Sequence, residues 1–209
     1  MRLGASALAI ALVVGALLGA LAALRQNSPG DYAVMTAATL GITIPTFVVA
    51  PILQLVFGLD LGWLPVGGWN DGAIRNTILP ITTLALPQIA VISRLTRASM
   101  IEVLRSHHIR TLRSQGMPLR YILKHSLRGA ALPVVSYLGP AAAALLTGSI
   151  VVENIFGLPG VGRYFVDGAL NRDYTLVMGT VILVAVLVVI FNLFVDLLYA
   201  WLDPRVRYE

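Results

Sequence analysis

The chain has 209 residues, of which 57% are hydrophobic and only 12% are charged, and its mean hydropathy is +0.83. A soluble domain carries about 25% charged residues, so the composition excludes that class and predicts an integral membrane protein. The net charge of +5 does not indicate nucleic-acid binding, because Lys and Arg are grouped by side of the predicted membrane. The absence of cysteine excludes disulfides, thiolate metal sites and a cysteine nucleophile.

Five apolar stretches are long enough, or nearly so, to cross a hydrocarbon core about 30 Å thick as helices. They are Leu3–Leu24, Tyr32–Phe57, Asn76–Ser93, Gly129–Val152 and Tyr174–Leu202. The first four contain no Asp, Glu, Lys or Arg, and the last contains only Asp196, for which we expect a packing or interfacial role. We therefore predict an all-α, polytopic transmembrane bundle that forms a single domain over residues 1–209.

The distribution of Lys and Arg predicts the orientation of this bundle. Four of these residues fall on one side, namely Arg2, Arg75, Arg163 and Arg172. Eleven fall on the other side, namely Arg25, Arg94, Arg97, Arg105, Arg110, Arg113, Arg120, Lys124, Arg128, Arg205 and Arg207. The positive-inside rule places the second set in the cytoplasm, together with the C-terminus.

The same rule leaves the N-terminus outside the cell. One explanation for an external N-terminus is that a membrane span that preceded Leu3–Leu24 has been lost. The alternative is that Leu3–Leu24 is a signal peptide, with Ala20-Leu21-Ala22 as its cleavage site.

Residues 94–128, between the third and fourth stretches, form a basic cytoplasmic segment. Apolar residues recur on one helix face at Ile101, Leu104, Ile109 and Leu112. Gly116 suits the position just after a helix, and Pro118 suits the first turn of the next one. A second amphipathic piece follows over residues 119–128. The pattern predicts a helix–break–helix unit.

Two interpretations of this unit remain open from periodicity alone. It could lie against anionic lipid as a basic interfacial helix pair, or it could dock a cytoplasmic partner. His107, His108 and His125 do not indicate a metal site, because the first two point in different directions on a helix and no carboxylate cluster joins them.

Three stretches resemble one known family. Arg110-Thr111-Leu112-Arg113-Ser114-Gln115-Gly116, followed by residues 125–133, resembles the EAA loop of ABC importer permeases, and more narrowly of their oligopeptide/dipeptide/nickel branch. Residues 153–162 are similar to the E-x-x-F-x-x-P-G-x-G loop of that branch, and the tail from Asn192 to Arg205 resembles its N-x-x-x-D-x-x-Y-x-x-x-D-P-R pattern. The resemblance covers essentially the whole chain.

This resemblance implies a transport subunit without bond chemistry or a cofactor of its own. Residues 110–116 would couple to two cytoplasmic ABC ATPase subunits or domains, which bind the ATP. The external loop 153–173 would gate the pathway or contact an external substrate-binding protein, through Glu153, Asn154, Gly157, Pro159, Gly160 and Gly162. A second homologous permease and membrane lipid complete the expected partners, in a bacterial or archaeal inner membrane, with peptides as the leading substrate class.

The chain departs from the family pattern in three respects. Gly129 stands where Asn commonly follows the Arg. Leu112 stands where the branch often has Ala, and the chain begins at what resembles the family's second span, so a first span is expected to be missing. No G-x-x-x-x-G-K-[ST] sequence is present, which agrees with an ATPase on other subunits. The alternatives are an ion-coupled transporter or channel subunit without an ATPase, and an inactive truncated permease.

Overall fold

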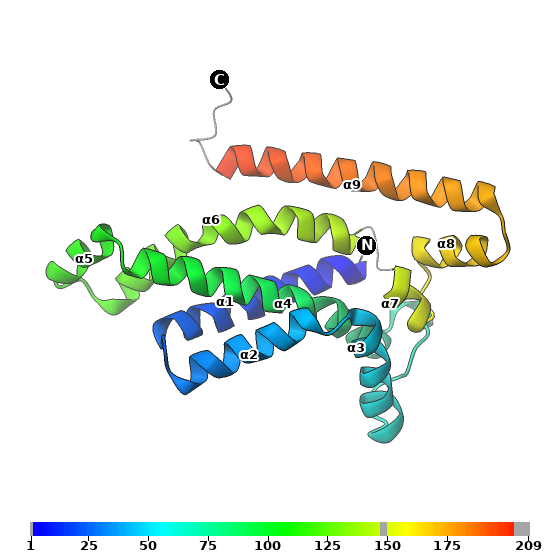
Figure 1. The fold of residues 1–209 in the computed structure, drawn as a ribbon, viewed down its shortest axis with the longest axis horizontal. Helices are drawn as coiled ribbons and strands as arrows, with labels where there is room; N and C mark the ends of the chain where they lie inside the picture. The colour runs from blue at the N-terminus through cyan, green and yellow to red at the C-terminus, as the bar shows by residue number, and fades with distance from the viewer. Residues whose placement is uncertain (1, 147–149, 203–209) are drawn as a thin grey trace. The chain divides into compact units, whose positions relative to one another are not determined.

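The computed structural model describes residues 2–146 and 150–202, and within these ranges the secondary structure is helical with no strand. In chain order the elements are α1 (Arg2–Leu24), α2 (Pro29–Thr43), α3 (Thr46–Leu53), the π-helical η1 (Gln54–Asp60), the 3-10 helix η2 (Asn70–Gly72), α4 (Ile74–Leu104), α5 (His107–Ser114), α6 (Leu119–Leu146), α7 (Ile150–Ile155), α8 (Val161–Leu170) and α9 (Tyr174–Leu202), as Figure 1 shows. The prediction of an all-α fold is confirmed.

The described residues include three helices that are long and apolar enough to cross a membrane. These are α1, α4 and the Tyr174–Phe194 part of α9, and the number rises to four if α2 and the helical stretch Thr46–Asp60 form one interrupted span. The sequence predicted about five. Its fourth stretch, residues 129–152, coincides with the second half of α6 but also includes residues 147–149, which lie outside the described ranges.

The second predicted span, Tyr32–Phe57, is not a single helix. The chain leaves helical geometry at Pro45, whose φ and ψ are −62° and 146°, and α3 begins at the next residue. Proline has no backbone N–H and cannot continue the hydrogen-bond ladder of α2, which explains the interruption. Asp196 lies on α9, but its side chain, like the tail motif at residues 203–205, falls outside the described part of the chain.

The chain divides into two compact units. Unit 1 comprises residues 1–9, 44–87 and 139–209, and unit 2 comprises residues 10–43 and 88–138. Each of α1, α4 and α6 contributes residues to both units.

In unit 2, α1 packs closely against α4 because two glycines four residues apart leave room for it. A Cβ added at Gly15 would lie 2.9 Å from the Ile92 Cβ, and one at Gly19 would collide with the carbonyl oxygen of Ser93. Small residues at this spacing are the usual way in which membrane helices bring their backbones together. On the side of α6, the Ser99 hydroxyl donates a hydrogen bond to the Ala130 carbonyl at 3.0 Å.

In unit 1, α8 and α9 form a helical hairpin, visible in Figure 1 as two helices side by side. The Leu176 N–H donates to the Asp173 carboxylate at 3.0 Å, which caps the start of α9. Gly168 allows the close approach, because a Cβ there would lie 3.2 Å from Val177. Over Tyr174–Phe194 the remaining surface of α9 is largely apolar and exposed, as expected for a helix that faces lipid or a neighbouring subunit.

Candidate functional site

The connector between α4 and α6 is built around α5, a helix with a defined cap at each end. Ser106 interrupts the helical path at φ −63° and ψ 154°, and its hydroxyl accepts the N–H of Ile109. At the other end Gly116 adopts φ +72°, the Gly116 N–H donates to the Arg113 carbonyl at 3.0 Å, and the Met117 N–H donates to the Leu112 carbonyl at 3.1 Å. These two bonds form a Schellman motif, so the predicted place of Gly116 directly after a helix is confirmed.

The prediction of one helix face through residues 101–112 is wrong. The helix α4 continues to Leu104 and then stops, and α5 starts a new direction at His107. The apolar spacing did not reveal the break between α4 and α5, because its only sequence signal is the N-cap serine Ser106, which lies within an otherwise unbroken apolar pattern.

One apolar contact layer holds α5 in place. Ile109 is fully buried and Leu112 is 9% exposed, and both pack with Ile122 from α6 and with Val103 and Leu104 from α4. Leu112 therefore supports α5 from the inside and does not face a partner. The helix is fixed to both of its neighbours, as a part that transmits motion must be.

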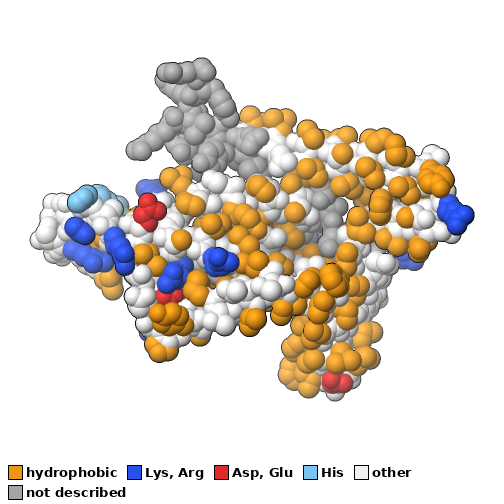
Figure 2. Space-filling view, in the orientation of Figure 1, with side chains coloured by type: hydrophobic (Ala, Val, Ile, Leu, Met, Phe, Trp, Pro, Cys, Tyr) orange, Lys and Arg blue, Asp and Glu red, His pale blue; other side chains and the backbone are white. Residues whose placement is uncertain are grey.

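The other six residues of the predicted coupling set are exposed, namely Arg110, Thr111, Arg113, Ser114, Gln115 and Gly116. Lys and Arg side chains gather around this connector in Figure 2, and α5 carries no acidic residue. No ion pair to Arg110 or Arg113 is found within the part of the chain that the structure describes. The same part contains no group of three His, Cys, Asp or Glu residues that could hold a metal ion. The result is a small basic surface on a rigid helix.

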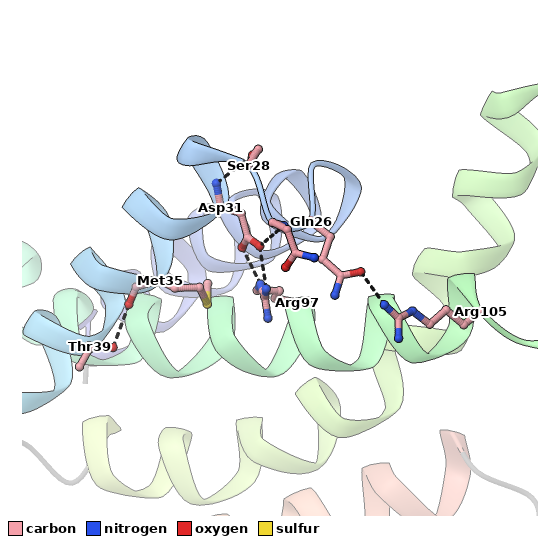
Figure 3. Close-up of polar contacts among 8 residues, drawn as sticks. Gln26, Ser28, Asp31, Met35, Thr39, Arg97 and Arg105 are labelled. Carbon is pink, nitrogen blue, oxygen red and sulfur yellow. Dashed lines mark hydrogen bonds and ion pairs between the residues drawn. The ribbon is translucent and has the colours of Figure 1, made fainter.

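A buried ion pair joins the turn between α1 and α2 to α4, and the sequence analysis missed it. The Arg97 guanidinium donates two hydrogen bonds to the Asp31 carboxylate, Nε to Oδ1 at 2.6 Å and Nη2 to Oδ2 at 2.7 Å (Figure 3). The Asp31 side chain is 1% exposed and that of Arg97 is 25% exposed. The backbone N–H of Asn27 also donates to Asp31, at 2.9 Å. This bidentate geometry is the strongest arrangement that an Arg–carboxylate pair can make.

A second contact is made by Arg105, the first residue after the end of α4, about two helical turns beyond Arg97. The Arg105 Nη2 donates to the Gln26 side-chain oxygen at 3.0 Å, as Figure 3 also shows. The α1–α2 turn is thus tied to α4 at two points, and the second point is next to the start of α5. A weak signal in the sequence was available, since Asp31 directly precedes one predicted span and Arg97 follows another by four residues on the same side, but several other arginines lie there too.

The turn between α7 and α8 explains the glycine-rich motif of residues 153–162. The Glu153 carboxylate accepts the N–H of Gly162, in the first turn of α8, at 2.8 Å. A Cβ at Gly160 would collide with that carboxylate, and one at Gly162 would lie 2.5 Å from the Ile150 Cα. Burial raises the pKa of Glu153, and the hydrogen bond from Gly162 opposes this effect. The motif is therefore a helix cap that needs two glycines to admit its carboxylate.

The predicted external residues accordingly divide into two kinds. Glu153, Gly160 and Gly162 form the cap, with Gly162 buried and the other two half-buried. Asn154, Gly157 and Pro159 are exposed on the outside of the turn. The stretch that the sequence treated as a loop also contains a ten-residue helix, α8.

A neighbouring loop of unit 1 is fastened to the same turn. The Gly68 N–H donates to the Phe156 carbonyl at 2.8 Å, and the Gln54 amide donates to the carbonyls of Val66 and Ile155 at 2.5 Å and 3.2 Å. The Asn76 amide donates to the Gly68 carbonyl at 3.1 Å. Residues 54–76 and the α7–α8 turn thus form one continuous surface, which the sequence did not predict.

Several apolar helices of membrane-spanning length, joined by a basic and rigidly capped connector, define a multi-pass membrane protein. The chain belongs to the family of binding-protein-dependent transport system inner membrane components, whose profile matches residues 15–208. The resemblance to ABC importer permeases is confirmed by this match.

The curated relatives are peptide transport permeases. The chain is 53% identical to the oligopeptide transport system permease protein OppB of Haemophilus influenzae and 54% identical to that of Escherichia coli, over 208 residues in each case, which is 99% of this chain and 68% of each relative. It is 44% identical to the dipeptide transport system permease protein DppB of Bacillus subtilis over 207 residues, which is 67% of that protein.

Proposed function

We propose that this chain forms half of a peptide pathway through a bacterial inner membrane, as one permease of an ATP-driven importer. An external binding protein delivers the peptide, a second homologous permease supplies the other half of the pathway, and separate cytoplasmic subunits bind ATP. Peptides are proposed as the substrate because relatives from three organisms bear the names of oligopeptide or dipeptide permeases.

The observation that carries the ATPase contact is the construction of α5. Both ends of the helix are capped, its inner face is fixed to α4 and α6, and its outer face presents Arg110, Arg113 and Gln115. A displacement of α5 by the ATPase would be transmitted to α4 and α6 through the buried contacts of Ile109 and Leu112. The hydrogen bonds from Arg97 to Asp31 and from Arg105 to Gln26 would transmit the same displacement to the α1–α2 turn.

The orientation that this proposal needs is α5 in the cytoplasm and the α7–α8 turn outside. The charge distribution favours it, because eight of the Lys and Arg residues lie within residues 94–128. The exposed residues Asn154, Gly157 and Pro159 are then the proposed contacts of the binding protein or gate.

Crosslinking tests the ATPase contact, because the chain contains no cysteine. Gln115→Cys in the assembled transporter should form a crosslink to a single cysteine in the surface groove of the ATPase, and ATP should change its yield. Two matched controls should give none: Leu112→Cys, which is on the same helix but buried, and Leu170→Cys, which is exposed on α8. Equal crosslinking of Gln115→Cys and Leu112→Cys, or none in a verified complex, would refute the proposed contact.

A further inference from the structure

A groove lies between α2 and α4 in unit 2. Its volume is about 460 Å³, and its lining residues are Met35, Ile42, Val91, Arg94, Leu95, Arg97 and Ala98. This size is within the range of about 300–1,000 Å³ that is usual for small-ligand sites. Apolar side chains make up most of the wall, and the two arginines supply its polar part.

The charge of the groove comes from Arg94 alone. Arg97 is bound to Asp31, so that pair is neutral as a whole and fixes the start of α2 beside α4. Figure 3 shows Met35 and Arg97 on the facing sides of these two helices. Arg94 is exposed, and its guanidinium has no ion pair or hydrogen bond within residues 2–146 and 150–202. One unbalanced positive charge therefore remains.

The predicted depths of the lining residues in the membrane indicate which end of the groove lies near the lipid headgroups. Arg94 directly follows the apolar stretch Asn76–Ser93, which places it at the level of the lipid headgroups. Ile42 is eleven residues beyond Asp31 along α2, which is about 16 Å deeper at 1.5 Å per residue. The apolar wall thus begins beside the charge and runs into the hydrocarbon core.

We propose that this groove binds an anionic phospholipid, with the headgroup phosphate at Arg94 and an acyl chain along Met35, Val91 and Ile42. A positive charge at headgroup depth next to an apolar channel matches both ends of such a lipid. A zwitterionic lipid offers the same phosphate and acyl chains, but its ammonium group is repelled by Arg94 and leaves the site with a net positive charge, so the site selects for negative headgroups. The proposal does not depend on the transported substrate.

The test measures binding of phosphatidylglycerol and phosphatidylcholine to the intact transporter complex, by native mass spectrometry. Arg94→Gln should weaken phosphatidylglycerol binding about five-fold, the effect of one basic residue at an anionic membrane surface. Arg94→Lys should retain most of the binding. Ala98→Phe fills the groove without changing its charge and should weaken the binding of both lipids.

Arg163→Gln is the matched control, because Arg163 is exposed on α8 and outside the groove. Unchanged phosphatidylglycerol binding in both Arg94→Gln and Ala98→Phe would overturn the proposal. Equal affinity of the unaltered complex for the two lipids would also overturn it. So would an efficient crosslink from Ala98→Cys to the second permease, because a protein would then cover the groove.

Discussion

The contact between Asp31 and Arg97 should hold the α1–α2 turn on α4, and Asp31→Asn tests this with little change of shape. The substitution leaves Arg97 without its counter-charge, next to a site that is 1% exposed. Breaking a fully buried ion pair by removing one partner costs about 3–5 kcal/mol. The Arg97 side chain is 25% exposed and keeps some access to water, so we expect a smaller cost, about 2 kcal/mol.

The expected result is a local opening of this turn, which a single cysteine can report. Ala23 is 5% exposed and packs against Met100 and Ala130 at the end of α1, so Ala23→Cys becomes reactive when the turn leaves α4. A loss of about 2 kcal/mol corresponds to alkylation about 30-fold faster in native membranes, since each 1.4 kcal/mol is a factor of ten. Leu158→Cys, buried in unit 1, should react at its original rate.

A double-mutant cycle distinguishes the ion pair from a general loss of stability. Adding Arg97→Gln to Asp31→Asn removes the unpaired charge, so the double variant should react more slowly than Asp31→Asn alone. If Asp31→Asn left the alkylation of Ala23→Cys unchanged, or if the two substitutions had simply additive effects, the ion pair would not hold the α1–α2 turn on α4.

Three further predictions concern the two capped turns. In Gly116→Ala the added Cβ meets no atom, but the residue must keep a φ of +72°, so the end of α5 should lose about 1 kcal/mol of local stability. Hydrogen exchange of the α5 amides should then become about five-fold faster, whereas that of the α9 amides should not change. Gly160→Ala should displace the Glu153 carboxylate and speed tryptic cleavage at Arg163, whereas Gly179→Ala, which meets no atom within 4 Å, should not. Because burial raises the pKa of Glu153, the folded protein binds this proton more tightly than the unfolded chain, so stability falls as pH rises through the raised pKa. Glu153→Gln should flatten the fall in thermal stability that sets in as the pH rises above about 4, near the ordinary pKa of Glu, and an unchanged slope would argue against the burial of this carboxyl.

The helices that the sequence predicted best are those with a continuous apolar pattern. Leu3–Leu24 agrees with α1 to within a residue, because no proline or charge interrupts it before Arg25. The third span was predicted to end at Ser93, yet α4 continues to Leu104. Hydropathy marks where a helix leaves the membrane and not where its backbone hydrogen bonds end, so helices that extend into the cytoplasm are cut short by this criterion.

The site was predicted in part, and what was missed has a common cause. The exposure of the residues that we propose to couple to the ATPase follows from the spacing of Ile109 and Leu112 within α5, and the place of Gly116 follows from local helix-end chemistry. The bond from Glu153 to Gly162 spans nine residues and depends on the fold of a turn, while the pair of Asp31 and Arg97 spans 66 residues. The order of residues along the chain does not say which of them lie close together in space, so the tertiary structure is needed to identify these two contacts.

We propose that the chain conducts peptides in a process driven by ATP on other subunits. The most direct measurement is uptake of a radiolabelled oligopeptide into proteoliposomes that contain the complete transporter, with binding protein outside and ATP supplied to the ATPase side. We expect uptake that needs both ATP and the binding protein, and that falls sharply when an arginine pair on α5, Arg110→Glu with Arg113→Glu, reverses the charge of the proposed docking surface. Uptake that proceeds without ATP and follows an imposed ion gradient would contradict it.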